Sequence, residues 1–342
     1  MDPLLLSAAC QLYHTQPHLL TRLSGGHYND VYQFPLSQAT IDPETSNASP
    51  GWKYGILRLG IEDCPPEQTM SMLDWVSYMK RQGAPVAAPL PSSNGRLLEH
   101  LEFEHQRYNL TAFEKATGTL AEDIPPSAWT DDLFRSIGSA VGKFHHISSG
   151  YQPGFPGFNR PHWFDSYEVQ DAFRRFADSS DPTVDRLRHL IHELRLQPTS
   201  AEDYGLIHED LHFANFLVGE GGLVTVIDFD DCAYGWFAID IAMALFDVLV
   251  LYNAGDETES QHFARRFMTA YLSGYRREFN LTANWLSQIP RFLKLKELCV
   301  YATLVGHPDI ALPDTWVGRF MRNRAERIAF DLPYVDIDFS TL

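Results

Sequence analysis

Three polar residues near the middle of the chain have the types and the spacing that phosphoryl transfer requires. Asp210 and Asn215 lie in a segment of the form H-x-D-L-x-x-x-N over residues 208–215, and Asp228 follows in an I-D-F-D run. A carboxylate can accept or orient the proton of an attacking hydroxyl, while an amide oxygen and a second carboxylate can hold Mg²⁺ against phosphate oxygens. Two β-rich runs separated by glycines lie between Asn215 and Asp228, so a hairpin would bring the three side chains together.

A second pattern overlaps the same segment. His208, Glu209 and His212 form H-E-x-x-H, in which two histidines one helical turn apart bind zinc and the glutamate activates water. Asp228 or Asp231 would then supply the third ligand. This motif must lie in a helix, and the glycine before it and the β-rich runs after it leave little room for one. A zinc hydrolase is therefore the less favoured alternative.

The elements that must position these residues differ between two parts of the chain. Early in the chain the sequence predicts a helix over 4–20, a hairpin from strands within 23–34 and 53–59, a helix over 67–81, a second hairpin over 86–99 and a strand over 108–114. Later it predicts helices over 129–148, 166–176 and 184–196. We therefore expect an α+β fold with a β-rich N-terminal lobe, residues 1–113, and a mainly helical C-terminal lobe, residues 114–342.

The charge and composition of the chain argue against nucleic-acid and membrane partners. Of the 342 residues, 44 are acidic and 27 are basic, which gives a formal net charge of −17. Such a field repels nucleic-acid phosphates and anionic membranes and attracts cations. The four cysteines are scattered, and the apolar run 239–251 is interrupted by Asp240 and Asp247 and is shorter than the ~20 residues of a membrane span. With no secretion signal at the N-terminus, we expect a cytoplasmic protein without a nucleic-acid or membrane partner.

The loop and metal motifs resemble those of the aminoglycoside phosphotransferase and choline kinase-like family, whose members share a bilobal protein-kinase-like fold. That family usually has H-G-D-L-H-x-x-N in the loop, and here Glu209 replaces the usual glycine. The resemblance implies that Asp210 is the catalytic base and that Asn215 and Asp228 hold Mg²⁺. A bulky, charged residue at position 209 could alter the loop or the substrate site.

Two further residues match positions that support the loop in this family. The resemblance implies that His208 supports the loop from within and that Asp240, in the run W-F-A-I-D-I-A, braces it from a following helix. Both would act through the catalytic residues rather than on the substrate.

The resemblance also extends to the nucleotide site. The run that contains Gly25 and Gly26, with Asn29 after it, is similar to an abbreviated nucleotide loop, in which glycine lets backbone amides approach phosphate. Arg58 stands in a strand where a lysine usually pairs with the α- and β-phosphates, and a guanidinium can still contact phosphate. Gly25, Gly26, Asn29 and Arg58 are therefore expected to bind nucleotide.

In the similar family a glutamate of the following helix pairs with the basic residue that stands at position 58, and the sequence does not show which residue takes that role here. Glu67 lies at the start of the following helix, and Met72 occupies the aligned position. If no acid pairs there, the chain would be a nucleotide-binding pseudokinase that serves as an interaction scaffold. The run 111–115 is similar to the family's interlobe hinge, so Phe113 and Lys115 are expected near adenine.

The resemblance implies an ATP- and Mg²⁺-dependent kinase that transfers the γ-phosphoryl group to a hydroxyl of a small molecule. The absence of an A-P-E signature after the metal motif argues against a protein substrate, and the acidic charge favours an acceptor that carries an amine. His212, Asp231 and Trp236 are candidates for contact with this acceptor, although Asp231 could equally serve local solvation. Trp163 and Tyr234 could complete an aromatic cage or pack in the core. The sequence leaves the acceptor's identity and the oligomeric state open.

Overall fold

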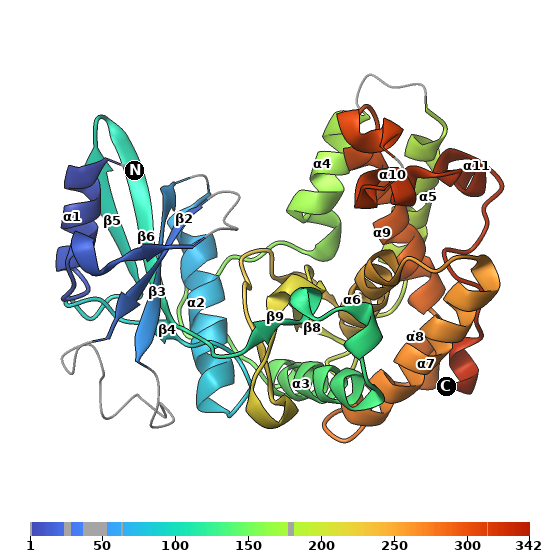
Figure 1. Cartoon of the computed structure of the whole chain (residues 1–342), viewed down its shortest axis with the longest axis horizontal. Helices are drawn as coiled ribbons and strands as arrows, with labels where there is room; N and C mark the ends of the chain where they lie inside the picture. The colour runs from blue at the N-terminus through green and yellow to red at the C-terminus, as the bar shows by residue number, and fades with distance from the viewer. Residues whose placement is uncertain (1, 24–28, 37–52, 63, 177–180, 313) are drawn as a thin grey trace. The chain divides into compact units, whose positions relative to one another are not determined.

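The computed structural model describes residues 2–23, 29–36, 53–62, 64–176, 181–312 and 314–342. The chain divides into two compact units, one formed by Met1–Gly118 with Tyr151–Arg160 and the other by Thr119–Gly150 with Pro161–Leu342 (Figure 1). The first unit is rich in strands and the second is mainly helical. The separation of strands and helices into two units confirms the predicted α+β fold class.

An antiparallel sheet forms the centre of the first unit, in the order β1-β2-β3-β6-β4, with β5 also paired to β6. Its strands are β1 (Thr21–Arg22), β2 (Asn29–Pro35), β3 (Tyr54–Ile61), β4 (Pro89–Leu90), β5 (Leu98–Phe103) and β6 (Gln106–Glu114). β2 and β3 pair as the sequence predicts, with Tyr32 opposite Leu57. Alternate residues of β2, β3 and β6 are buried against Leu5 and Ala9 of α1 (Pro3–Gln11), because successive side chains of a strand point to opposite faces.

The predicted hairpin over 86–99 is wrong. β4 and β5 each pair with β6 instead of with one another. The hairpin in this region joins β5 to β6 through Glu104 and His105, which have φ of 48° and 66°. Two-residue hairpin turns favour this left-handed backbone, and glycine or asparagine is its usual sequence signal. Because neither residue stands here, the sequence does not mark the turn.

Of the two helices predicted in this unit, one is confirmed and the other is shorter than predicted. α2 (Pro66–Arg81) confirms the helix expected over 67–81; it has a proline at its start, and Gly83 follows it with φ of 84°. The helix expected over 4–20 is wrong in length, because α1 ends at Gln11. His14 takes a left-handed φ of 51°, and Pro17 starts a separate short 3₁₀ turn.

Residues 151–160 return to the first unit and are anchored on α2. The Asp74 carboxylate accepts hydrogen bonds from the Gly154 backbone N–H, at 2.9 Å, and from the Tyr151 hydroxyl. The Ser71 hydroxyl accepts one from the Asn159 N–H at 2.8 Å. Polar groups of α2 thereby satisfy the backbone of a segment that has no strand or helix of its own.

Helices dominate the second unit. They are α3 (Asp131–Ser149), α4 (Tyr167–Arg175), α5 (Thr183–Arg195), α6 (Phe237–Tyr252), α7 (Glu257–Tyr275), α8 (Ala283–Leu286), α9 (Ile289–Leu304), α10 (Trp316–Met321) and α11 (Arg324–Ala329). α3, α4 and α5 confirm the three helices that the sequence predicts. The strands are β7 (Thr119–Leu120), β8 (Tyr204–Ile207), β9 (Phe216–Val218), β10 (Val224–Val226) and β11 (Ala233–Trp236), in two small sheets ordered β10-β9-β7 and β11-β8. Within the described ranges, none of the helices has the length and apolar character needed to cross a membrane.

α3 and α7 approach one another closely because glycines lie at their contact. A Cβ atom at Gly138 would stand 2.0 Å from the Tyr271 carbonyl oxygen, and one at Gly274 would stand 1.9 Å from the Arg135 carbonyl oxygen. Only glycine allows the two backbones to meet at this distance. This contact holds together the helices that carry His145 and Tyr275, both of which take part in the site described next.

Candidate active site

The loop that follows β8 is the centre of the candidate site. β8 pairs with β11, and residues 208–212 continue from β8 as an irregular loop that leads into a 3₁₀ turn, Phe213–Asn215. The β9–β10 hairpin then returns the chain, and the Ile227 N–H donates to the Asn215 carbonyl at 3.0 Å. The predicted hairpin is confirmed, and it brings the residue before Asp228 into contact with Asn215.

His208 connects the loop to the strand end that precedes Asp228. Its side chain is fully buried, and its Nε2 lies 2.9 Å from the Ile227 carbonyl oxygen. Its Nδ1 accepts the Asp210 N–H at 3.3 Å, so Nε2 carries the proton and donates to Ile227. The imidazole thus fixes the backbone on both sides of the hairpin.

Helix α6 supports the loop with two aspartates. Asp240, in its first turn, accepts the backbone N–H of His208 at 2.9 Å and that of Glu209 at 2.8 Å. Asp247, two turns further along, accepts the Phe213 N–H at 2.7 Å. We call this pair of carboxylates the α6 cradle. Asp240 is predicted from the sequence, whereas Asp247 is not, although two aspartates seven residues apart in an apolar helix share one face and could have indicated it.

Asp240 is also held from α3. The His145 Nε2 lies 2.9 Å from an Asp240 oxygen, and its Nδ1 lies 2.9 Å from the Tyr275 hydroxyl. Burial lowers the pKa of His145 despite the opposing effect of Asp240, so the imidazole is neutral at pH 7. Both Asp240 oxygens are thus engaged, one by His145 and the His208 N–H and the other by the Glu209 N–H.

Two residues of the site have left-handed backbones. Glu209 has φ of 71° and Asp228 has φ of 64°. Glycine adopts this conformation freely, and other residues lose about 1–2 kcal/mol in it. The glycine that is usual at position 209 in the similar family therefore has a conformational reason, and Glu209 keeps the same backbone at some cost.

Asp210, His212 and Asn215 lie together at the end of the loop. The His212 Nε2 is 3.2 Å from an Asp210 carboxylate oxygen, and both side chains are partly exposed. The Asn215 side-chain amide donates to the Asp210 carbonyl at 2.8 Å. Since its nitrogen is engaged in this way, the Asn215 amide oxygen is the atom left for a ligand.

Charge around this group keeps Asp210 ionised. Burial alone would raise the pKa of Asp210, but the hydrogen bond from His212 and the positive Lys296 outweigh it and hold that pKa below its usual range. Burial would lower the pKa of His212, and the Asp210 carboxylate outweighs it and raises that pKa. The pair therefore favours a carboxylate facing a protonated imidazole.

Lys296 and Glu168 are charged residues of the site that the sequence analysis misses. The Lys296 ammonium on α9 lies 2.7 Å from a Glu168 oxygen on α4. Burial acts against the charge on Lys296, and the carboxylates of Glu168 and Asp210 outweigh it and raise its pKa. No local motif links residues so far apart in sequence, so only the packing of α4 on α9 could have indicated them.

The candidates for contact with an acceptor are not gathered in one place. His212 lies beside Asp210, and Asp231 is exposed in the loop before β11. Trp236 is buried, with its ring stacked 5.1 Å from that of Trp285 and its indole N–H directed at the Pro198 carbonyl. Trp163 packs against Trp236 and also lines a cavity next to the loop.

The predicted nucleotide residues lie in the first unit as far as the structure describes them. Gly25 and Gly26 lie outside the described residues. Asn29 begins β2, opposite Gly60, and Arg58 lies in β3 with its guanidinium 5.8 Å from the centre of the Phe113 ring. The structure thus brings Arg58 and Phe113 together.

Lys115 and the two residues considered for the acid position are also placed. The Lys115 ammonium donates to the Gln33 side-chain oxygen at 2.6 Å. Met72 is buried in α2, and Glu67 stands in its first turn. An apolar residue therefore occupies the aligned position, as the sequence indicates.

The H-E-x-x-H interpretation lacks the helix that it needs. Residues 208–212 form an irregular loop, so His208 and His212 are not one helical turn apart. Both ring nitrogens of His208 are already engaged, one by Ile227 and one by Asp210. The sequence pattern is thus a coincidence of residue types rather than a zinc site.

Known proteins resemble this chain over most of its length. The model of a family described as the phosphotransferase enzyme family matches residues 49–279. Amicoumacin kinase of Bacillus subtilis (strain 168) is 34% identical over 275 residues, which is 80% of this chain and 80% of that protein. The family-model match includes the whole loop, the hairpin and the α6 cradle.

Solved structures extend the similarity to the fold. An amicoumacin kinase in complex with AMP-PNP, Ca²⁺ and Ami has a TM-score of 0.84 and 27% identity, and the match covers 99% of this chain and 96% of that one. A microcompartment-associated aminopropanol kinase has a TM-score of 0.68 at 22% identity, covering 96% and 98% of the two chains. The predicted bilobal, protein-kinase-like fold is confirmed.

Proposed function

This chain belongs to the phosphotransferase enzyme family and is a small-molecule kinase, and we propose that it transfers the γ-phosphoryl group of ATP to a hydroxyl of a small, amine-bearing molecule. The observation that carries the proposal is the loop after β8. There His208 and the α6 cradle fix the backbone, and the Asp210 carboxylate is left partly exposed beside His212 and Asn215. Kinases among its relatives favour this enzyme over the pseudokinase scaffold.

Asp210 is the proposed catalytic base. Its lowered pKa keeps it ionised at pH 7, so it can accept a hydrogen bond from the acceptor hydroxyl and orient the oxygen toward phosphorus. Phosphoryl transfer depends more on such positioning and on charge stabilisation than on strong proton abstraction. A weakly basic carboxylate is therefore sufficient for this role.

Asn215 and Asp228 are the proposed ligands of Mg²⁺. The donor set fits this ion, because the free atom of Asn215 is an amide oxygen, Asp228 carries an exposed carboxylate, and Mg²⁺ prefers oxygen ligands. When bound, Mg²⁺ would neutralise charge on the phosphate oxygens. The Ile227–Asn215 hydrogen bond, at 3.0 Å, holds the backbone of the two ligands in register.

ATP is the proposed phosphoryl donor. The family and the AMP-PNP bound to the similar amicoumacin kinase support this choice. We propose that Gly25, Gly26 and Asn29 approach the phosphates, that Arg58 contacts them, and that Phe113 and Lys115 lie near the adenine. A guanidinium suits two phosphate oxygens because its donors form a planar fork.

The acceptor is proposed to carry an amine as well as a hydroxyl. The name of the similar aminopropanol kinase describes such a molecule, and the net charge of −17 favours cations. His212 and Asp231 remain proposed contacts, and His212 lies beside Asp210. Trp236 is buried and packs in the core.

The test is Mg²⁺-dependent transfer from γ-labelled ATP to a panel of amino alcohols, aminoglycosides, sugars and hydroxy amino acids. Asp210→Asn serves as the paired variant, and Asp185→Asn, an exposed change on α5, is the matched control. Labelled product with the wild type and the control, but not with Asp210→Asn, would support the proposal. Nucleotide binding without transfer to any acceptor would count against it.

A further inference from the structure

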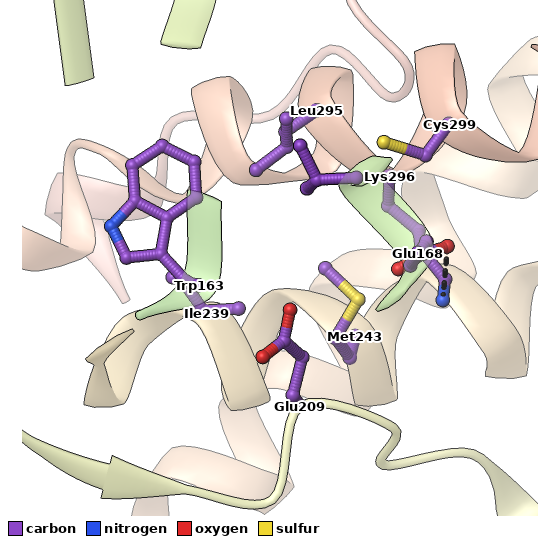
Figure 2. Close-up of a pocket in the computed structure, with 9 residues that line it drawn as sticks. Trp163, Glu168, Glu209, Ile239, Met243, Leu295, Lys296 and Cys299 are labelled. Carbon is purple, nitrogen blue, oxygen red and sulfur yellow. Dashed lines mark ion pairs between the residues drawn. The ribbon is translucent and has the colours of Figure 1, made fainter. Parts of the chain in front are cut away.

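A small cavity lies in the second unit beside the loop that carries Asp210. Figure 2 shows its lining, which is mostly apolar apart from three charged side chains. The lining residues are Trp163, Glu168, Val169, Glu209, Ile239, Met243, Leu295, Lys296 and Cys299. We call this space the Glu209 cavity.

The Glu209 carboxylate points into the cavity, between Ile239 and Met243 (Figure 2). The residue is only 7% exposed, and its Oε2 atom is buried without a hydrogen-bond partner. Leaving a buried polar atom unpaired costs about 1–3 kcal/mol, and more when the group is charged. A group that enters the cavity and donates a hydrogen bond would satisfy this oxygen.

The nearby lysine does not supply that donor. The Lys296 ammonium lies 2.7 Å from Glu168, on the other side of the cavity (Figure 2). Burial, together with the carboxylates of Glu168, Asp231 and Asp240, outweighs the lowering effect of the Ser166 hydroxyl and raises the pKa of Glu209 well above its usual range. The site therefore gains most from a cation that enters from outside and restores the charged carboxylate.

The size of the cavity limits what can enter. It offers about 10 Å³ to the centre of a water-sized group, which is room for about one such group. A primary ammonium is of that size, whereas a ring or a trimethylammonium is much larger. Trp163 adds an aromatic side chain to the lining, and such rings attract cations.

We propose that Glu209 binds a primary ammonium group of the acceptor while Asp210 orients its hydroxyl. The inference rests on the proposed function and assigns Glu209 a role in substrate specificity. Lys296, which lines the cavity, also acts electrostatically on the Asp210 carboxylate, so the cavity lies close enough to Asp210 for one small molecule to reach both carboxylates. The favoured acceptor is an amino alcohol whose amine and hydroxyl are separated by few bonds.

Calorimetric titration tests this assignment on the full chain with nucleotide bound. The probes are ethanolamine, 1-amino-2-propanol and kanamycin, and propane-1,2-diol is the amine-free control. The variants are Glu209→Gln, which keeps the shape without the charge, and Glu209→Gly, which also removes the left-handed strain. Glu220→Gln, an exposed acid in the same unit, is the matched control.

We expect at least one primary amine to bind to the wild type and to Glu220→Gln, with a Kd that rises at least tenfold in both Glu209 variants. Equal affinity in the Glu209 variants would overturn the inference, because the cavity would then hold only water. Failure of every amine to bind would overturn it as well. In that case, phosphoryl transfer to amine-free alcohols would support the proposed kinase reaction but not an amine on its acceptor. Glu209-dependent binding of an amine without transfer would support the amine site and count against the kinase reaction.

Discussion

Asp240 of the α6 cradle and Glu209 of the neighbouring Glu209 cavity are both buried, and they differ in how far their carboxylates are hydrogen-bonded. Asp240 accepts hydrogen bonds from two loop amides and from His145. Glu209, whose own N–H is one of those two amides, has a carboxylate oxygen without a partner. A buried carboxyl group whose oxygens are all engaged maintains a conformation, whereas one with an unpartnered oxygen retains bonding capacity that a ligand can use.

The comparison predicts that the two carboxylates differ in their effect on stability. Asp240→Ala leaves two backbone amides and a buried imidazole unpaired, so we expect a loss of about 3–5 kcal/mol in the free energy of unfolding. Phosphoryl transfer should be lost with it, because the loop loses its support. Urea unfolding followed by circular dichroism measures the first effect and the labelled-ATP assay the second.

Glu202→Ala, at an exposed acid of the same unit, is the control for this change. It should alter the free energy of unfolding by less than about 0.5 kcal/mol. A comparably small effect of Asp240→Ala would mean that the cradle does not hold the loop.

Asp210→Asn should lower catalytic activity while leaving the stability of the loop nearly unchanged. We expect kcat to fall at least about 100-fold, because the amide no longer accepts a proton or orients the hydroxyl as the carboxylate does. Stability should change by less than about 1 kcal/mol, since the Asp210–His212 pair is partly exposed. Steady-state kinetics and urea unfolding of the same preparation give both values, and a normal kcat would remove Asp210 from the mechanism.

Sequence patterns identified what lies close along the chain. The loop motif marked His208, Asp210 and Asn215, and their contacts span only a few residues. The repeat of apolar positions predicted α2, because local periodicity determines which face of a helix is buried. The unusual Glu209 was also visible as a departure from the usual glycine.

What the sequence missed depends on contacts between distant segments. The Lys296–Glu168 pair joins α9 to α4, and the segment 151–160 returns to α2 through Asp74 and Ser71. The β5–β6 turn was missed because Glu104 and His105 take a left-handed backbone that they rarely adopt. In each case tertiary packing stabilises a contact or a backbone conformation that the local sequence does not predict.

Glu209→Gly should have the opposite effect on stability to Asp240→Ala. It relieves a left-handed backbone, worth about 1–2 kcal/mol, and removes the unpartnered carboxylate, while glycine costs about 1 kcal/mol in chain entropy. We expect the free energy of unfolding to rise by about 1 kcal/mol in urea titrations without ligand. Glu220→Gly, at an exposed neighbouring turn, should give no gain, and a less stable Glu209→Gly protein would show that the carboxylate already has a stabilising partner.

The smallest expected effect is a dependence on pH that distinguishes the two regions. Burial raises the pKa of Glu209 in the folded chain, so the folded state binds a proton that the unfolded state releases above the ordinary glutamate pKa of about 4.3. Folding stability from this group is therefore present at low pH and is lost as pH rises from that value toward the raised pKa. His145 acts in the opposite sense: its lowered pKa means that stability is lost as pH falls below the ordinary histidine value of about 6.5.

Comparing the wild type with Glu209→Gln isolates the first effect, because His145 is present in both and cancels in the difference. The wild type should lose stability relative to the variant as pH rises above about 4.3, with a slope of at most about 1.4 kcal/mol per pH unit. Urea unfolding at a series of pH values measures this difference. A primary amine that binds at Glu209 should reduce this difference in stability. The bound cation stabilises the charged carboxylate, which forms as the pH rises and is otherwise unfavourable in the buried cavity. A difference that is flat with pH would mean that Glu209 is already paired in the free protein, and the contrast with Asp240 would then disappear.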